Sequence, residues 1–216
     1  MQQNQNPGVK MIACDFSSKA VTLIKDNPLY TAEDIVGKIG ASVWDVASPQ
    51  DQETGKSQLP EGIQPGTIDV VILIFIFSAL APEQWDQAVK NVWTALKPGG
   101  VVLFRDYGRG DLAQVRFKKG RYLDENFYVR GDGTRVYFFD EDELRTLWQG
   151  TPDAKSIHQT DSEAPEAKPS TLDEVELRPR FEIVNFGVDR RMLVNRQRRL
   201  KMYRCWMQGL FRKPLG

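Results

Sequence analysis

The sequence predicts an α/β protein built around a parallel β-sheet, and three consecutive patterns within residues 68–108 support this fold class. Residues 70–77 form a continuous apolar run rich in β-branched and aromatic side chains, which is typical of a strand buried on both faces. Pro82 opens a stretch with apolar residues at helical spacing, and the glycines of LKPGG end it. A second apolar run begins at Val101. Strand, helix and strand in this order predict a parallel βαβ unit.

Two shorter strands are predicted before this unit, and each ends in an acidic residue. Residues 9–14 are apolar and finish at Asp15, and residues 41–44 finish at Asp45. Apolar positions at helical spacing predict a short helix after the first of these strands. Residues 47–67 are polar and rich in proline and glycine, so we expect them to form a surface loop.

Further elements are predicted downstream of the βαβ unit. They are a hairpin with an Asp-Gly turn at residues 127–130 and 135–139, a helix over residues 140–148, and final strands at residues 181–188 and 201–207. The final strands are separated by the basic run of residues 190–199. Residues 150–179 are rich in Ser, Thr, Pro, Glu and Asp, which predicts a mobile insertion. We therefore expect residues 1–216 to form one domain that carries this insertion.

Composition narrows the class of protein. At 216 residues the chain can form one domain with a sizeable core, and 41% apolar with 27% charged residues is ordinary for a soluble protein. The sequence has no cationic leader and no run of about 18 apolar residues, so we expect a cytoplasmic protein without a membrane partner. The formal net charge is zero, so nucleic-acid binding would depend on local clusters. Cys14, Cys205 and His158 are too few and too scattered to predict a metal site or a disulfide framework.

Several strings in the sequence resemble a known family. A buried strand, a helix that closes on LKPGG and a strand that ends in a charged loop resemble the second half of class I methyltransferases, which depend on S-adenosylmethionine. The strings ACDFS, LIFIFSA, LKPGGVVLFRDYG, RFK and ENFYVRGDGTR are similar to the eukaryotic tRNA 3-methylcytidine methyltransferases, which modify a cytidine in the anticodon loop. The resemblance implies a Rossmann-like sheet with helices on both faces, S-adenosylmethionine as cofactor and tRNA as substrate. It also allows a protein partner that aids tRNA recognition.

The candidate cofactor residues lie where three predicted strands end. The resemblance assigns this role to Asp15, Phe16, Asp45, Val46, Ile74 and Phe75. A carboxylate at the carboxyl edge of a parallel sheet can accept hydrogen bonds from a ribose diol, the role implied for Asp15. The resemblance further implies that Asp45 recognises the adenine amino group and that Ile74 and Phe75 pack on the adenine ring. Without the resemblance, acids at strand ends are more often turn formers or helix caps.

Asp106 and Tyr107 end the second strand of the βαβ unit and are the candidate catalytic residues. Ring nitrogen N3 of cytidine is unprotonated at neutral pH, so its alkylation needs alignment with the sulfonium more than a strong general base. The carboxylate of Asp106 could stabilise the positive charge that develops on the base, and Tyr107 could stack on it. The alternative is that Arg105 and Asp106 form a structural ion pair and that Tyr107 only packs.

Basic and aromatic residues alternate after this strand, which predicts contacts with RNA. Guanidinium and ammonium groups contact phosphates, and aromatic rings stack on unpaired bases. The residues assigned to this contact are Arg109, Arg116, Phe117, Lys118, Phe127 and Arg130. The basic residues of the run from 190 to 204 predict a second electrostatic surface. Without the resemblance, an ordinary solvated basic surface is an equally good interpretation of both.

Class I methyltransferases begin with a strand and a glycine-rich loop that approaches the methionine part of the cofactor. Neither precedes the Asp15 strand in this sequence, so the resemblance implies an N-terminally shortened member. We expect the methyltransferase activity of this chain by itself to be impaired. The strands of Asp15 and Ile74 would then lose a central neighbour and its ladder hydrogen bonds. Two other interpretations stay open: a non-catalytic RNA- or partner-binding fragment of the same fold, and, with less support, a Rossmann-type oxidoreductase.

Overall fold

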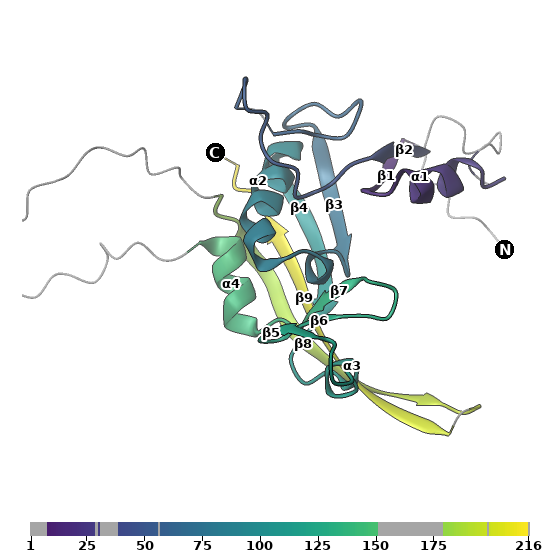
Figure 1. Cartoon of the computed structure of the whole chain (residues 1–216). Helices are drawn as coiled ribbons and strands as arrows, with labels where there is room; N and C mark the ends of the chain where they lie inside the picture. Colours follow the sequence, from purple (N-terminus) through teal and green to yellow (C-terminus); the bar gives the residue numbers. More distant parts are fainter. Residues whose placement is uncertain are drawn as a thin grey trace, which may run out of the picture.

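A computed structural model describes residues 8–28, 30, 39–55, 57–150, 179–197 and 199–215. The predicted insertion at residues 150–179, with His158, falls almost wholly outside this part of the chain. The elements in chain order are β1 (Met11–Asp15), α1 (Ser18–Lys25), β2 (Ile39–Val43), β3 (Ile68–Ile74), η1 (Phe77–Ala79), η2 (Pro82–Gln84), α2 (Trp85–Ala95), β4 (Leu96–Tyr107), α3 (Leu112–Val115), β5 (Tyr122–Asp124), β6 (Phe127–Val129), β7 (Arg135–Tyr137), α4 (Glu141–Gln149), β8 (Glu182–Asn195) and β9 (Leu200–Arg212) (Figure 1).

The strands of the described residues form three sheets. The largest has the order β3-β4-β9-β8, the second is the pair β1-β2, and the third has the order β5-β6-β7 (Figure 1). β3 and β4 run parallel and α2 connects them, which confirms the predicted βαβ unit. β9 and β8 add to the same sheet in antiparallel pairing, so the α/β sheet is mixed.

Two strands that the resemblance places on either side of a common neighbour have open edges here. Within the described residues, β1 pairs in parallel with β2 alone, and β3 pairs with β4 alone. Figure 1 shows β1, β2 and α1 beside the main sheet rather than in it. The carboxyl ends of β1 and β3 therefore belong to separate sheets.

The prediction that residues 70–77 form a strand buried on both faces is wrong in its burial. β3 ends at Ile74 because Phe75 takes a positive φ of 57°, and the chain then turns into η1. Leu73 is buried, but alternate side chains are exposed: Val70 by 46%, Ile72 by 61% and Ile74 by 52%. The reason is that α2 and α4 pack on the face that carries Leu73, since side chains of a strand alternate between the two faces.

The core lies between the four-stranded sheet and helices α2 and α4. Its centre is Trp148 of α4, whose ring stacks on Phe211 of β9 with centroids 4.5 Å apart and also contacts Phe77 and Phe104. All four rings have at most 3% of their surface exposed. α4 is held at its start by Asp140, whose carboxylate accepts a hydrogen bond from the backbone of Glu141. The main sheet and α4 are therefore held together by a buried aromatic cluster.

β8 and β9 are longer than the sequence indicates, and the basic run is not a linker between them. Residues 190–195 belong to β8 and pair with β9 up to the contact between Asn195 and Leu200. Basic side chains also suit a strand whose faces meet solvent. A run of positive charge therefore does not by itself indicate a loop. The predicted hairpin at residues 127–139 is confirmed as β6 and β7, and β5 adds a third strand to it.

Candidate functional site

Asp15 and Asp45 lie at the same carboxyl edge of the β1-β2 pair. Asp15 is opposite Val43, and its carbonyl oxygen accepts a hydrogen bond from the backbone of Trp44 at 2.9 Å. The Oδ1 atom of Asp15 accepts from the amide of Ser17 at 2.8 Å, and Oδ1 of Asp45 accepts from that of Ala47 at 2.9 Å. Each acid therefore closes a local turn with one oxygen. The described residues provide no partner for either Oδ2 atom, so the ribose and adenine roles stay predictions.

The loop after β2 is anchored to the main sheet by Asn91 of α2. Asn91 is fully buried, and its Nδ2 atom donates to the carbonyl oxygens of Val46 at 2.9 Å and Ser48 at 2.8 Å. The Oδ1 atom of Asn91 accepts from Gln87 at 2.9 Å. Asn91 was not among the predicted site residues, although a polar residue between Ala88 and Val92 on the apolar side of a predicted helix was a usable signal. This contact fixes the segment that follows Asp45 relative to α2.

At the carboxyl ends of β3 and β4, Phe75 and Tyr107 lie against each other. Their ring centroids are 4.6 Å apart with planes inclined by 33°. The positive φ of Phe75 is uncommon for a residue other than glycine, and its backbone amide still donates to the carbonyl of Arg105 at 2.8 Å. Phe16, which follows Asp15 at the other edge, is 78% exposed. The structure thus brings one predicted cofactor residue into contact with one predicted catalytic residue.

Asp106 points into the core and holds the turn after β3. Its side chain has no exposed surface, and its Oδ2 atom accepts a hydrogen bond from the amide of Ser78 at 2.9 Å. Burial raises the pKa of Asp106 to about 6, and the hydrogen bonds from Ser78 partly oppose this shift. Arg105 lies on the other face of β4, where it pairs with Asp189 at 3.4 Å and lies over the ring of Trp206 at 4.2 Å. The alternative of an Arg105–Asp106 ion pair is therefore wrong, because successive strand residues face opposite sides.

Tyr107 is surrounded by cations as well as by aromatic rings. Arg130 donates from Nη2 to the phenol oxygen of Tyr107 at 2.8 Å, and its guanidinium carbon lies 5.5 Å from the ring centroid. The guanidinium carbon of Arg204, on β9, lies 5.8 Å from the same centroid. Cations at such distances from an aromatic face are attracted to it. Tyr107 is therefore held in one orientation at the sheet edge by a hydrogen bond and by cation–π contacts, in addition to its packing against Phe75.

The residues predicted to bind RNA divide into two groups. Arg116 and Lys118 are exposed, and the described residues contribute no ion pair to either. Phe117 stacks on Tyr128 with centroids 4.7 Å apart. The others are engaged inside the protein: Arg109 pairs with Asp140 and Glu125, Arg130 holds Tyr107, and Phe127 is 9% exposed against Tyr137. Stacking of Phe127 on a base is therefore contradicted by its burial, which follows from its inward position on β6.

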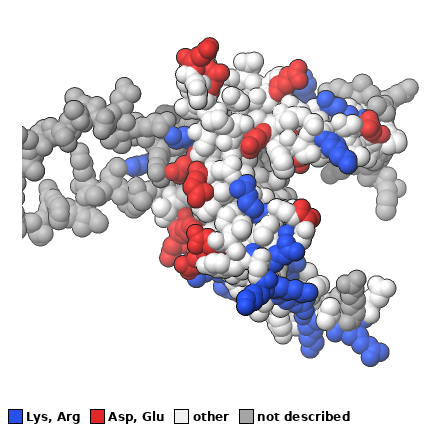
Figure 2. All heavy atoms as spheres, in the orientation of Figure 1, with Lys and Arg blue, Asp and Glu red and all other residues white. Residues whose placement is uncertain are grey.

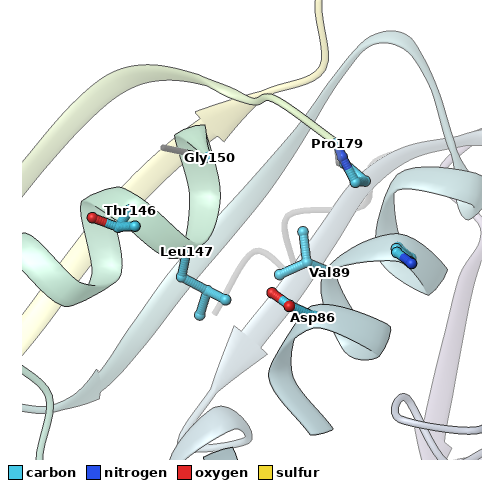
Figure 3. A pocket seen from close by; sticks show the side chains of 7 residues that line it. Asp86, Val89, Thr146, Leu147, Gly150 and Pro179 are labelled. Carbon is cyan, nitrogen blue, oxygen red and sulfur yellow. The ribbon is translucent and has the colours of Figure 1, made fainter. Parts of the chain in front are cut away.

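Two hollows occur near these residues. The first is a cavity of about 10 Å³ between α2 and α4, lined among others by Val89, Leu147 and Pro179, which has room for about one water molecule (Figure 3). The second, of about 570 Å³, lies over the exposed face of the main sheet and is lined by Ile74, Leu103, Arg105, Asn185, Asp189 and Gln208 among others. It is an open hollow on the sheet surface rather than an enclosed cavity. Only the second hollow borders the ends of β3 and β4.

Two classes of feature are missing from the part of the chain that the structure describes. No helix there has the length and apolar character needed to cross a bilayer. No group of three or more His, Cys, Asp or Glu side chains is arranged there to hold a metal ion.

Comparison with known proteins gives a consistent result. Residues 2–102 match a family model described as a methyltransferase domain. The chain is 45% identical over 215 residues to the tRNA(Thr) (cytosine(32)-N(3))-methyltransferase of Saccharomyces cerevisiae, covering 99% of this chain and 28% of that protein. It is 43% identical over 213 residues to the tRNA N(3)-methylcytidine methyltransferase of Schizosaccharomyces pombe, covering 99% and 56%. It is 40% identical over 215 residues to a human tRNA N(3)-cytidine methyltransferase, covering 100% and 46%.

Solved structures support the fold alone. The crystal structure of a SAM-dependent methyltransferase from Methanosarcina mazei matches with a TM-score of 0.55 and 18% identity, over 95% of this chain and 82% of that one. A protein of Pyrococcus horikoshii matches with a TM-score of 0.55 and 14% identity, over 95% and 72%. These matches confirm the predicted Rossmann-like methyltransferase fold. The chain spans about half, or less, of the curated relatives named above, and over its own length it is similar to tRNA N(3)-methylcytidine methyltransferases at 40–45% identity.

Proposed function

We propose that this chain is the catalytic part of an S-adenosylmethionine-dependent methyltransferase that forms 3-methylcytidine in the anticodon loop of tRNA. One observation carries the proposal: in a chain 40–45% identical to the three tRNA cytidine methyltransferases named above, β3 and β4 end side by side, with Phe75 against Tyr107 and with Asp106 on the core side of β4. The carboxyl edge of an open α/β sheet is where such folds bind ligands. Relatives covering the same residues carry this activity in their names.

We assign the cofactor to the edge formed by β1, β2 and the end of β3. The free Oδ2 oxygens of Asp15 and Asp45 would accept from the ribose hydroxyls and from the adenine amino group. Val46 would lie beside the adenine, in the loop that Asn91 holds in place. Ile74, exposed at the end of β3, offers an apolar surface for the purine. When bound, S-adenosylmethionine would supply an electrophilic methyl group on its sulfonium.

The chain's own residues would orient the base and compensate its charge. Tyr107, fixed by Arg130 and Phe75, would stack on the target cytidine so that the lone pair of N3 points at the methyl carbon. Methylation at N3 would give the base a positive charge. Asp106 faces the core on the opposite side of β4 from Tyr107, so its carboxylate, ionised above a pKa of about 6, would stabilise that charge across the strand rather than by contact.

The proposal includes tRNA as the macromolecular partner and a cytoplasmic location, where tRNA is available to the enzyme. Arg116 and Lys118, exposed after α3, would contact the phosphates, and Phe117 would contribute an aromatic surface beside them. We also include a protein partner that aids tRNA recognition. The family resemblance supports this partner.

The experiment incubates the chain with unmodified tRNA and methyl-labelled S-adenosylmethionine, and then identifies the labelled nucleoside after complete digestion. A second protein carries, ahead of residue 1, a strand and glycine-rich loop of the class I type. The proposal expects labelled 3-methylcytidine with the second protein and a smaller amount with the first. Label in another nucleoside, or RNA binding with no label in either protein, would overturn it, and the latter result would favour a non-catalytic RNA-binding module.

A further inference from the structure

The distal part of the β8-β9 hairpin leaves the main sheet. Pairing between β4 and β9 ends at the contact of Tyr107 with Trp206, but pairing between β8 and β9 continues to Asn195 and Leu200. Residues 190–195 and 200–205 therefore form a two-stranded ribbon, which we call the β8-β9 arm. Figure 1 shows that it extends beyond the other elements of the structure. An isolated ribbon of this kind is marginally stable in water unless something covers or binds it.

The arm carries a concentrated positive charge. Residues 190–204 contain no acidic residue, and their cations are Arg190, Arg191, Arg196, Arg198, Arg199, Lys201 and Arg204. Two of the described cations are neutralised at the base of the arm, Arg191 by Asp189 and Arg204 by Asp111. The described carboxylates form no ion pair with the others. Figure 2 shows Lys and Arg side chains gathered over α3 and this arm. A chain with zero formal net charge thus concentrates cations at one end.

One face of the arm presents an exposed aromatic ring among these cations. Tyr203 lies directly opposite Met192, and the two side chains are 61% and 50% exposed. The next pair on the same face joins Val194 to exposed Lys201. Tyr203 is thus a flat apolar surface beside a free ammonium group. A face of this kind suits an unpaired base whose phosphate is bound next to it.

The base of the arm lies beside Tyr107, one of the candidate catalytic residues. Arg204 donates from Nε to Oδ2 of fully buried Asp111 at 2.9 Å, and its guanidinium carbon lies 5.0 Å from the Trp206 ring. The same guanidinium carbon is 5.8 Å from the ring of Tyr107. Because Asp111 also caps α3, the arm and the α3 segment with Arg116 and Lys118 are joined at one point. A strand of RNA with one base at Tyr107 would therefore have its flanking phosphates within reach of both.

We propose that the β8-β9 arm is an RNA-binding element that holds nucleotides next to the methylated cytidine, with Arg196, Arg199 and Lys201 on phosphates and Tyr203 stacked on an unpaired base. This inference rests on the proposed function and adds a second binding surface to it. The density of positive charge without any acid favours a polyanion over a protein surface, where charges of both signs are the norm. The narrow ribbon and its single exposed aromatic ring favour single-stranded RNA near a stem.

The test measures binding of the 216-residue chain to two fluorescent RNAs, a hairpin with an unpaired loop and a fully paired duplex of equal length. The variants are R196A/R199A, Tyr203→Ala and Tyr203→Phe, with Lys25→Ala on α1 as the loss of one positive charge elsewhere. R196A/R199A should weaken binding to both RNAs by about tenfold and lower the salt slope by about one for each phosphate that the arm no longer binds. Tyr203→Ala should weaken binding to the hairpin by about fivefold or more and leave the duplex unchanged. Tyr203→Phe should bind like the parent.

Three results would overturn the inference. The first is R196A/R199A binding RNA as Lys25→Ala does, and the second is a Tyr203→Ala variant that loses affinity equally for hairpin and duplex. The third is an unmodified chain that binds neither RNA but self-associates or binds anionic vesicles, which would show that the arm meets another partner. Because binding is read without methyl transfer, loss of the proposed activity and loss of this surface can be told apart. Circular dichroism of each variant checks that the fold is retained.

Discussion

The buried amide of Asn91 in α2 donates to the carbonyl oxygen of Val46, 2.9 Å away in the loop that follows β2. This bond, with its partner to Ser48, joins the small β1-β2 sheet to the helix of the main βαβ unit. Pairing between strands does not make that connection in the described residues. The position of Asp45 relative to the ends of β3 and β4 therefore depends on a side-chain contact rather than on a continuous sheet.

Replacing Asn91 by Ala should lower the free energy of unfolding by about 1–3 kcal/mol, because the buried carbonyl of Val46 and the partly buried carbonyl of Ser48 lose their donor. Urea unfolding followed by circular dichroism measures the change. Glu83→Gln, on exposed η2, is the matched control and should stay within about 0.5 kcal/mol of the parent. An Asn91→Ala variant as stable as the control would show that water reaches the Val46 carbonyl without cost.

Asp106 predicts an unusual dependence of stability on pH. Its pKa is about 6 in the folded protein, against an ordinary value of 3.8, so between those values the folded state binds more protons than the unfolded state. Stability therefore falls as pH rises from about 4 to about 6, by at most about 3 kcal/mol, and is independent of this group above pH 6. The measurement is urea unfolding at several pH values for the parent and for Asp106→Asn. Their difference in unfolding free energy should change over this window and then become constant.

The same comparison can contradict the assignment. If the difference between the parent and Asp106→Asn is constant between pH 4 and 6 and instead rises with pH below about 4, the folded-state pKa lies below the ordinary value and the carboxylate is stabilised in the core. Methyl transfer provides a second readout, since ionised Asp106 is proposed to stabilise the cationic base. In an active protein, the rate should rise with pH through about 6 in the parent, and this rise should be absent in Asp106→Asn.

Arg116 and Lys118 are predicted to bind RNA phosphates. Replacing both by Ala should weaken tRNA affinity and reduce the slope of log affinity against log salt by about two, because a phosphate that is no longer bound keeps its counterions. Filter binding at several salt concentrations measures both quantities. Affinity for S-adenosylmethionine, measured by calorimetry, should stay constant. An unchanged salt slope would show that these exposed side chains belong to an ordinary solvated surface.

Arg130 is predicted to position Tyr107 rather than to contact a phosphate. In a double-mutant cycle with Arg130→Ala and Tyr107→Phe, the unfolding free energies should show a coupling of about 0.5–3 kcal/mol, because the two variants remove the same hydrogen bond. Arg130→Lys should keep part of the coupling, since an ammonium can donate but cannot match the fork of a guanidinium. Additive effects of the two substitutions would place Arg130 outside the environment of Tyr107.

The βαβ unit could be predicted because its signals are local. An uninterrupted apolar run, a helix with proline at its start and LKPGG at its end need no tertiary knowledge, and the β6-β7 hairpin has its own Asp-Gly turn. The similarity to tRNA N(3)-cytidine methyltransferases could also be predicted, from strings such as FRDYG. By contrast, the exposure of Ile72 and Ile74 depends on which face the helices cover. An apolar run has the same sequence whether one face is covered or two.

The side-chain partners of the site could not be predicted in the same way. Arg130 and Tyr107 are 23 positions apart, and Arg204 and Asp111 are 93 apart, so neither pair leaves a local pattern. Arg105 and Asp106 are adjacent, yet the strand sends them to opposite faces and to different partners. The basic residues of β8 were predicted to lie in a linker. The reason is that a run of basic residues lacks the alternation of apolar and polar side chains by which a strand is recognised. Contacts between distant segments, rather than composition, decide which of these cations remain available to a ligand.

The last prediction concerns the open edges of β1 and β3. A strand that pairs with both would supply ladder hydrogen bonds to each and would bring the Asp15 edge into one sheet with the Phe75 edge. In the part of the chain that the structure describes this connection is not made, because β1 pairs with β2 alone and β3 pairs with β4 alone. We therefore expect the chain to bind S-adenosylmethionine at least about tenfold more weakly than a version extended by a class I strand and glycine-rich loop, a difference of about 1.4 kcal/mol.

Calorimetry on both proteins tests this, with two further variants that separate the causes. In the first, the glycines of the added loop are replaced by valine, so that the new strand can still pair but the backbone cannot approach the cofactor. It should regain protection of the β3 amides against hydrogen exchange without regaining affinity. In the second, Asp15→Asn in the extended protein should weaken cofactor binding by about 1.5–3 kcal/mol, the loss expected for a charged acceptor. Equal affinity of the original and extended chains would show that β1, β2 and the end of β3 already form a complete cofactor site, held together by Asn91 alone.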